Sequence, residues 1–232
     1  MKIQLLNKCT ACILLVSSGS VAAAQSSSPE TPATNVAPTE SKRLLGIVPN
    51  YRSSQTLQDY QPLSPGDKFK IASEDAFDRG TVILGGIFGA EAQATNANRS
   101  FGQGAAGFGR YFGAAYGDLV IGDYMTEGVF PVLLHQDPRY FRKGQGSGWS
   151  RLRYAAGQIF WTHTDSGGTQ FNYSEIVGNS AAVAISNAYY ANNRTAGDAA
   201  DKLGVQIGVD MASNILKEFW PDLQRTFRRR HN

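Results

Sequence analysis

Two short segments of the chain combine a histidine with a nearby aspartate. One residue separates His135 from Asp137, and one residue separates His163 from Asp165. An imidazole titrates near neutral pH, and a carboxylate beside it can orient the ring for acid–base catalysis or for metal binding. Glu127 could supply a further carboxylate. These residue types would suit a hydrolase, either metal-dependent or based on a histidine and an aspartate.

A structural interpretation of the same segments is stronger. Asp137 stands directly before Pro138, and an aspartate in that position commonly caps the start of a turn or helix. Residues 165–168 read Asp-Ser-Gly-Gly, which is the composition of a turn. A histidine in the last turn of a helix is also favoured by the helix dipole without any catalytic role. The sequence therefore predicts no cofactor and no assigned metal site.

The segment 133–146, which reads LLHQDPRYFRKGQG, is accordingly predicted to be a helix end followed by a turn. We expect Leu133 and Leu134 to lie in the core. We expect Tyr140 and Phe141 to pack the following loop back onto the helices, as adjacent aromatic residues near helix ends commonly do.

Polar residues form a second constellation. Three of them, Gln206, Asp210 and Asn214, are spaced four residues apart and would share one face of a helix. A buried charge without a partner is too costly to keep. We therefore expect a polar network that fixes helix register; the alternative is a cleft lined for a polar ligand. The full candidate set is Glu127, Arg139, Glu175, Asn179, Gln206, Asp210 and Asn214. Within it, Arg139 is expected to pair with Glu175 or Asp210.

The elements that must position these residues are predicted to be helices, because the apolar residues recur at helical intervals and no useful run alternates as a strand does. Ser64 and Pro65 have the residue types of a helix start. Pro131 is expected to kink or end the second helix, and Pro221 to end the last one. The expected helices cover residues 64–94, 102–134, 149–164, 174–190 and 195–220. The fold class is therefore predicted to be all-α, a single bundle of about five helices.

Small residues recur every four positions in three of these helices. Each glycine inside a helix costs about 1 kcal/mol relative to alanine, so we expect a compensating close approach of backbones along these seams. Membrane helices pack in this way, but a tightly packed soluble bundle is favoured. The predicted seams are Ala105, Gly109, Gly113 and Gly117; Gly178, Ala182 and Ser186; and Gly204, Gly208 and Ala212.

A membrane-spanning helix needs about 20 predominantly apolar residues. The best uninterrupted apolar run in the first helix, TVILGGIFGA at residues 81–90, has only ten. The sequence therefore predicts no spanning helix and leaves peripheral association with a membrane open.

The first residues have the features of a secretory signal peptide. Lys2 and Lys8 are basic, an apolar stretch follows, and small residues end the segment, which we place at residues 1–24. Both cysteines, Cys9 and Cys12, lie within it. The mature chain is therefore expected to contain neither a disulfide nor a thiol, and packing must stabilise it.

The mature chain is predicted to have three parts. Residues 25–44 are rich in Ser, Pro and Thr and are expected to form a disordered linker. Residues 45–223 are expected to form the helical domain, and residues 224–232 a basic tail. The arginines of this tail, which could lie against an anionic lipid surface, are Arg225, Arg228, Arg229 and Arg230.

Charge argues against a nucleic-acid partner. The full chain has 22 lysines and arginines against 19 acidic residues. Removing Lys2 and Lys8 with the leader leaves 20 basic residues, and without the four arginines of the tail the body has 16 against 19 acidic residues. A nucleic-acid-binding domain needs a basic face on its folded body. The expected partners are anionic lipid or another envelope protein.

Three segments resemble a family of uncharacterised exported bacterial proteins: LLHQDPRYF at 133–141, FNYSEIVGN at 171–179 and ISNAYY at 185–190. The resemblance covers roughly residues 45–220. It implies export and a common fold, and it assigns no catalytic role to any residue.

These features favour an exported cell-envelope protein of structural or binding type, in the periplasm or associated with the outer membrane, and peripheral to a membrane. The alternative is a periplasmic hydrolase that uses the two His-x-Asp segments. The enzyme hypothesis requires that His135 and His163 approach each other and open onto a cleft.

Overall fold

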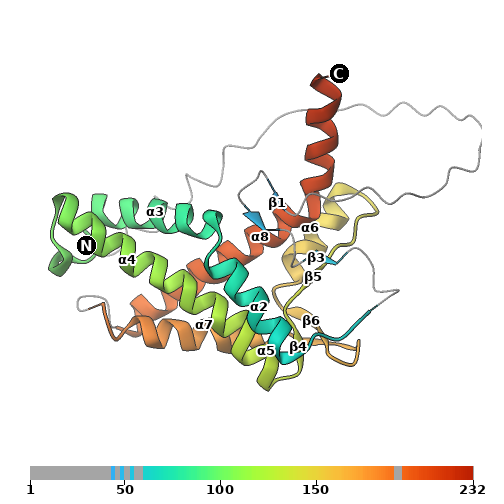
Figure 1. The fold of residues 1–232 in the computed structure, drawn as a ribbon, viewed down its shortest axis with the longest axis horizontal. Coiled ribbons are helices and arrows are strands. Elements are labelled where there is room, and N and C mark those ends of the chain that lie inside the picture. The colour runs from blue at the N-terminus through green and yellow to red at the C-terminus, as the bar shows by residue number, and fades with distance from the viewer. Residues whose placement is uncertain (1–42, 45–47, 50–52, 55–59, 191–194, 232) are drawn as a thin grey trace, which may run out of the picture. The chain divides into compact units, whose positions relative to one another are not determined.

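The computed structural model describes residues 43–44, 48–49, 53–54, 60–190 and 195–231, and this part of the chain is mainly helical (Figure 1). The helices are α2 (Pro65–Ala76), α3 (Arg79–Ala94), α4 (Gly104–Asp123), α5 (Phe130–Leu133), α6 (Gly148–Gly157), α7 (Tyr173–Ser186) and α8 (Ala196–His231). A 3-10 turn, η2 (Arg99–Phe101), and a π-helical segment, η3 (Tyr124–Val129), flank α4. The strands are β1 (Arg43–Leu44), β2 (Val48–Pro49), β3 (Ser53–Ser54), β4 (Gln136–Asp137), β5 (Tyr140–Phe141), β6 (Trp161–Thr164) and β7 (Thr169–Phe171).

The predicted signal peptide, residues 1–24, lies outside the described residues. So does the predicted linker, apart from Arg43 and Leu44, which form β1. Within the described residues, no helix is long and apolar enough to cross a membrane.

The first predicted helix is two helices. Its start is confirmed: the Ser64 side chain accepts a hydrogen bond from the backbone N–H of Asp67, and the Asp67 carboxylate accepts one from the backbone N–H of Ser64. Pro65 fills the first helical position. The helix then ends at Ala76, and the Asp78 side chain accepts from the backbone N–H of Gly80 to begin α3. The apolar periodicity runs through the break, which is why the pattern alone did not reveal it.

Two glycines of α3 allow it to lie close to α4. A Cβ atom on Gly89 would lie 2.8 Å from the Cα of Phe112 on α4, and one on Gly85 would lie 3.0 Å from the Cβ of Tyr116. Real Cβ atoms essentially never come closer than 3.0 Å, so α3 can lie this close to α4 only because residue 89 is a glycine. The space at Gly85 is tight, and a side chain there would require Tyr116 to move.

The predicted seams are only partly correct. On α7, a Cβ on Gly178 would lie 2.9 Å from Thr126, and Ala182 and Ser186 are buried. The seams on α4 and α8 are wrong, because their glycines face open space rather than a neighbouring backbone. Among the described residues, no atom outside the helix's own backbone lies within 4 Å of a Cβ built on Gly109, Gly113, Gly204 or Gly208.

The helix that begins at Gly104 changes its hydrogen-bonding pattern before Pro131. A proline cannot donate a backbone hydrogen bond, so regular α-helical bonding is interrupted there. The π-helical segment η3 precedes the short helix α5, which contains Pro131 and ends at Leu133. The predicted disturbance near Pro131 is therefore present.

The last helix does not stop at Pro221 as predicted. Helix α8 continues to His231 with Pro221 inside it, so the predicted tail begins within a helix. Figure 1 shows that α8 changes direction on its way to the C-terminus. A proline within a helix costs about 3 kcal/mol or more. The turn before it is held by Glu218, which is buried and accepts hydrogen bonds from Tyr140 and Arg151.

Small sheets correct the all-α prediction. Strands β4, β6 and β7 form an antiparallel sheet in the order β4-β6-β7, β3 pairs with β5 in parallel, and β1 pairs with β2. The third predicted helix, 149–164, ends at Gly157, and its last four residues are β6. These strands are two to four residues long, too short for alternation to be read from the sequence.

The segment 133–146 begins with a helix end, as predicted, but the two short strands β4 and β5 stand where only a turn was expected, and its core residues differ. Tyr140 and Phe141 are buried, as expected. Leu133 is 65% exposed and Leu134 is also exposed, so their predicted core positions are wrong. The helix ends at Leu133 and His135 adopts a positive φ of 53°, which carries the chain away before either leucine can be covered.

Candidate functional site

The two His-x-Asp segments lie side by side in the fold. Strands β4 and β6 are antiparallel, and Asp137 lies directly opposite His163. The backbone N–H of Asp165 donates to the carbonyl of His135, with a nitrogen–oxygen distance of 2.9 Å. Each histidine therefore lies opposite the aspartate of the other segment, an arrangement that the sequence analysis did not foresee.

The two histidines have different surroundings. The His163 side chain is buried, its ring meets the edge of Phe141 at 4.6 Å between centroids, and burial lowers its pKa even though the charge of Asp137 opposes that shift. Its Nδ1 has no hydrogen-bond partner among the described residues. The His135 side chain is 84% exposed, with its Nδ1 3.8 Å from a carboxylate oxygen of Asp165. One ring lies in the core and the other lies on the surface.

The ion-pair partner of Asp165 is Lys68, which lies closer to its carboxylate than His135 does. The ammonium of Lys68, which is almost completely buried, lies 2.7 and 2.8 Å from the two carboxylate oxygens of Asp165 and donates to the carbonyl of Pro131. This ion pair ties α2 to the turn after β6.

Asp137 is the partner of Arg139. Its buried carboxylate accepts bidentate hydrogen bonds from Nε and Nη2 of Arg139, at 3.0 and 2.6 Å. It accepts another hydrogen bond from the hydroxyl of Tyr60. The pairing of Arg139 with Glu175 or Asp210 is therefore wrong. The expected turn cap is confirmed, because Oδ1 of Asp137 accepts from the backbone N–H of Arg139 at 2.9 Å. Burial, and then the charge of Asp137, raise the pKa of Tyr60.

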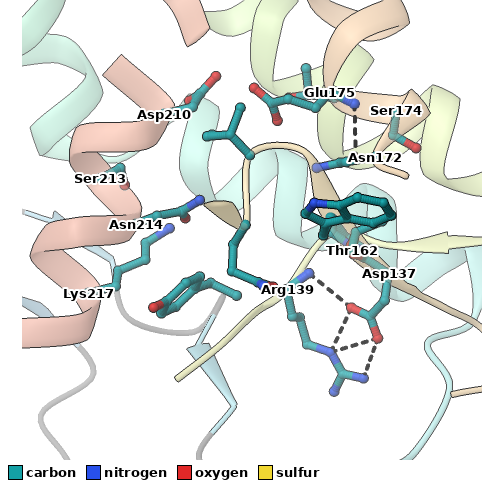
Figure 2. A pocket seen from close by; sticks show the side chains of 16 residues that line it. Asp137, Arg139, Thr162, Asn172, Ser174, Glu175, Asp210, Ser213, Asn214 and Lys217 are labelled. Atoms are coloured by element: carbon teal, nitrogen blue, oxygen red, sulfur yellow. Dashed lines mark hydrogen bonds and ion pairs between the residues drawn. The ribbon is translucent and has the colours of Figure 1, made fainter. Parts of the chain in front are cut away.

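A small hollow, which we call the polar cavity, lies between the turn after β4, strand β6 and helices α7 and α8 (Figure 2). Its volume is about 40 Å³. One water molecule occupies about 10–15 Å³ on this measure, so the cavity holds about three waters. The charged side chains that line it are Asp137, Arg139, Glu175, Asp210 and Lys217.

Helix α8 supplies one wall of the polar cavity. Asp210, Ser213, Asn214 and Lys217 line it, and their spacing of three and four residues places them on one face of the helix. Figure 2 shows these four side chains along the helix, facing Glu175 across the cavity. Two of the three positions that the sequence analysis aligned, Asp210 and Asn214, belong to this face, and Lys217 extends it by one turn. The third, Gln206, does not line the polar cavity.

Helix α7 supplies the opposite wall. Its first residue is preceded by Asn172, whose side chain accepts from the backbone N–H of Glu175 at 3.2 Å and so fixes the first turn. Asn179, one turn further on, donates to Glu175 at 2.8 Å and to Asp210 of α8 at 3.4 Å. The amide of Asn179 thus bridges the two helices behind the cavity.

The seven residues of the predicted polar set do not all lie at one site. Four of its members line the polar cavity: Arg139, Glu175, Asp210 and Asn214. Asn179 bridges two of these, Gln206 lies near Gly122 of α4, and Glu127 is buried in η3.

Several lining residues were missed by the sequence analysis. Lys217 could have been found, because it follows Asn214 by three residues on the same helix face. Trp161, which is 52% exposed, could not, because the strand that carries it was predicted as helix. The other missed polar residues of the lining are Thr126, Gln158, Thr162, Asn172, Ser174 and Ser213.

The geometry does not bring the hydrolase candidates into one cleft. Asp137 lines the polar cavity, but neither His135 nor His163 is among its lining residues. Across the described ranges, no three side chains of His, Cys, Asp or Glu are grouped as a metal ion would require.

No protein-family model, curated protein or solved structure matches the chain. The resemblance of residues 133–141, 171–179 and 185–190 to exported proteins remains a prediction.

Proposed function

We propose that the protein is an exported binding protein of the cell envelope, and that its polar cavity holds the hydroxyl-bearing end of a carbohydrate. The observation that carries this proposal is the convergence of polar side chains from the β4 turn, β6, α7 and α8 on one cavity. The half-exposed ring of Trp161 belongs to the same lining.

The chemistry of the lining favours an uncharged, hydrogen-bonding ligand. The charged groups nearly balance, with three carboxylates against one guanidinium and one ammonium. The remaining polar groups are amides and hydroxyls, which as a set both donate and accept hydrogen bonds. A sugar hydroxyl does both as well, so it can satisfy this mixture better than an anion or a cation can.

The size of the cavity limits what enters it. A volume of about 40 Å³ accepts one or two hydroxyl-bearing carbons, and not a whole sugar ring. The rest of the ligand would lie outside, where the exposed face of Trp161 offers an apolar surface for the C–H face of a ring.

The proposed location rests on the sequence. A basic n-region, an apolar stretch and small residues at positions 1–24 support export. We place the mature protein in the periplasm or at the outer membrane, peripheral to a lipid surface. The helical end of α8 that contains Arg225, which is exposed, is the proposed contact with anionic lipid. The hydrolase alternative gains no support, because His163 is buried and His135 lies on the surface.

Calorimetric titration tests the proposed ligand. The probes are glucose and N-acetylglucosamine and their soluble trimers, titrated into the mature protein. We expect saturable binding of at least one trimer. We expect Trp161→Ala to weaken it by about tenfold, which corresponds to about 1.4 kcal/mol.

The chain offers a matched control for this variant. Trp149 is 63% exposed on α6 and is not a lining residue of the polar cavity, so Trp149→Ala should leave binding unchanged. Equal losses in the two variants, or no saturable binding of any probe by the unmodified protein, would show that the cavity is not a carbohydrate site.

A further inference from the structure

A second and larger hollow, the apolar groove, lies between α3, α4 and α8. Its volume is about 380 Å³, within the range of about 300–1,000 Å³ that small-molecule sites occupy. The aliphatic side chains along it include Ile83, Leu84 and Ile87 of α3, Leu119 of α4 and Leu216 of α8. Ile83 and Ile87 are 48% and 58% exposed, so apolar surface here still faces water. Covering that surface would favour binding of an apolar chain.

The lining of the apolar groove also contains charged side chains, and most of them are acidic. Its lining contains three carboxylates, those of Asp75, Asp123 and Asp210, and one ammonium, that of Lys217. These four come from α2, α4 and α8 and share the groove with the aliphatic residues. Carboxylates outnumber ammonium groups in this lining, which favours a ligand that carries a positive group beside its apolar part.

We propose that the apolar groove binds a single-chain amphiphile with a cationic head group. The alkyl chain would lie against the aliphatic side chains, and the cationic head would face the carboxylates of Asp75, Asp123 and Asp210. The three aspartates argue against the surface of an anionic bilayer as the occupant, because like charges would oppose its approach. This inference goes beyond the proposed carbohydrate site and does not require it.

Three amphiphiles with the same alkyl chain and different head groups separate the contribution of the head group to affinity from that of the alkyl chain. They are dodecyltrimethylammonium, dodecyl maltoside and dodecyl sulfate, each titrated into the mature protein below its micelle-forming concentration. We expect the cationic compound to bind about tenfold more tightly than the neutral one, and the sulfate to bind most weakly. Asp123→Asn should reduce the advantage of the cation and leave the affinity for the maltoside unchanged.

A substitution that fills the groove provides the second test. Ala212 lines the apolar groove and is exposed, so Ala212→Trp should block it without disturbing the core. Ala200, also exposed on α8 and not a lining residue, gives the control Ala200→Trp. We expect loss of amphiphile binding in the first variant only. Neither Ala212 nor Asp123 lines the polar cavity, so carbohydrate binding should survive both substitutions and the two proposals can fail separately.

Three results would overturn the inference. One is equal affinity for the three head groups, and another is binding that Ala212→Trp leaves intact. The third is a dimer that Ala212→Trp dissociates in the absence of any amphiphile binding, because the groove would then be occupied by a second copy of the chain.

Discussion

The carboxylate of Glu218 is the most heavily used acceptor among the described side chains that hold α8 in place. It is 0% exposed and accepts hydrogen bonds from the hydroxyl of Tyr140 at 2.7 Å and from Nε of Arg151 at 2.7 Å. The backbone N–H groups of Lys143 and Gly144 donate to it as well, each at 2.9 Å. One side chain therefore joins α8 to α6 and to the loop after β5.

Replacing Glu218 with alanine removes all four acceptor contacts. It also leaves the buried guanidinium of Arg151 with the half-exposed Asp222 as its carboxylate partner. Breaking a buried ion pair by removing one partner costs about 3–5 kcal/mol, against a total stability of about 5–15 kcal/mol for a typical domain. At about 2–4 °C per kcal/mol for a domain of this size, we expect the melting temperature to fall by about 6–20 °C.

Urea denaturation at pH 7, followed by circular dichroism, measures the loss in the free energy of unfolding. The control is Glu91→Ala, which removes an exposed glutamate from α3 and should change the free energy of unfolding by less than about 0.5 kcal/mol. If Glu218→Ala costs under about 1 kcal/mol, as an exposed ion pair would, the contacts of Glu218 do not hold α8 as we infer.

The pH dependence gives a further check. Burial alone would raise the pKa of Glu218, but hydrogen bonds from Arg151, Tyr140 and the two backbone amides outweigh it, so the pKa lies below its ordinary value of 4.5. Because the folded state favours the ionised carboxylate, Glu218 stabilises the fold at pH values above its ordinary pKa. This stabilisation is lost as the pH falls through the pKa of the folded state. The difference between the unmodified protein and Glu218→Ala should therefore shrink below pH 4.5.

Three further predictions concern helix packing, tyrosine ionisation and lipid binding. Gly89→Ala should lower the melting temperature because its Cβ would collide with α4, whereas Gly109→Ala, which meets open space, should leave it unchanged or raise the stability by up to about 1 kcal/mol. Burial and the carboxylate of Asp118 raise the pKa of Tyr190, so Asp118→Asn should bring tyrosinate absorbance to a lower pH in a spectrophotometric titration. Deleting residues 224–232 should weaken sedimentation with anionic vesicles, and equal sedimentation of both forms would remove the proposed role of these arginines.

Local signals in the sequence predicted the starts of helices better than their ends. The serine and proline at positions 64 and 65 fix the start of α2, because the cap and the proline act within one turn. Pro221 is a local signal too, but contacts from distant segments to Glu218 override it. Strand β6 was missed for the same reason: its partners, β4 and β7, are short, and pairing with them decides its conformation.

The candidate site was predictable where it depends on one helix. The spacing of Asp210 and Asn214 placed both on the face of α8 that lines the polar cavity. Arg139 was assigned the wrong partner because it pairs with Asp137, only two residues before it. The sequence analysis gave Asp137 the role of a turn cap and no other. Trp161 could not be placed, since its exposure depends on a sheet that no local pattern predicted.

Helix α8 connects the two proposed sites. Asp210, Ser213 and Lys217 line both the polar cavity and the apolar groove. A cation beside the carboxylate of Asp210 in the groove would compete with Asn179, which donates to that carboxylate at 3.4 Å and to Glu175 on the cavity side. Any resulting change in the affinity for the polar ligand must be matched by an equal change in the affinity for the amphiphile, because coupling between two binding sites is reciprocal. The side chains that line both hollows would therefore couple the affinities for the two ligands.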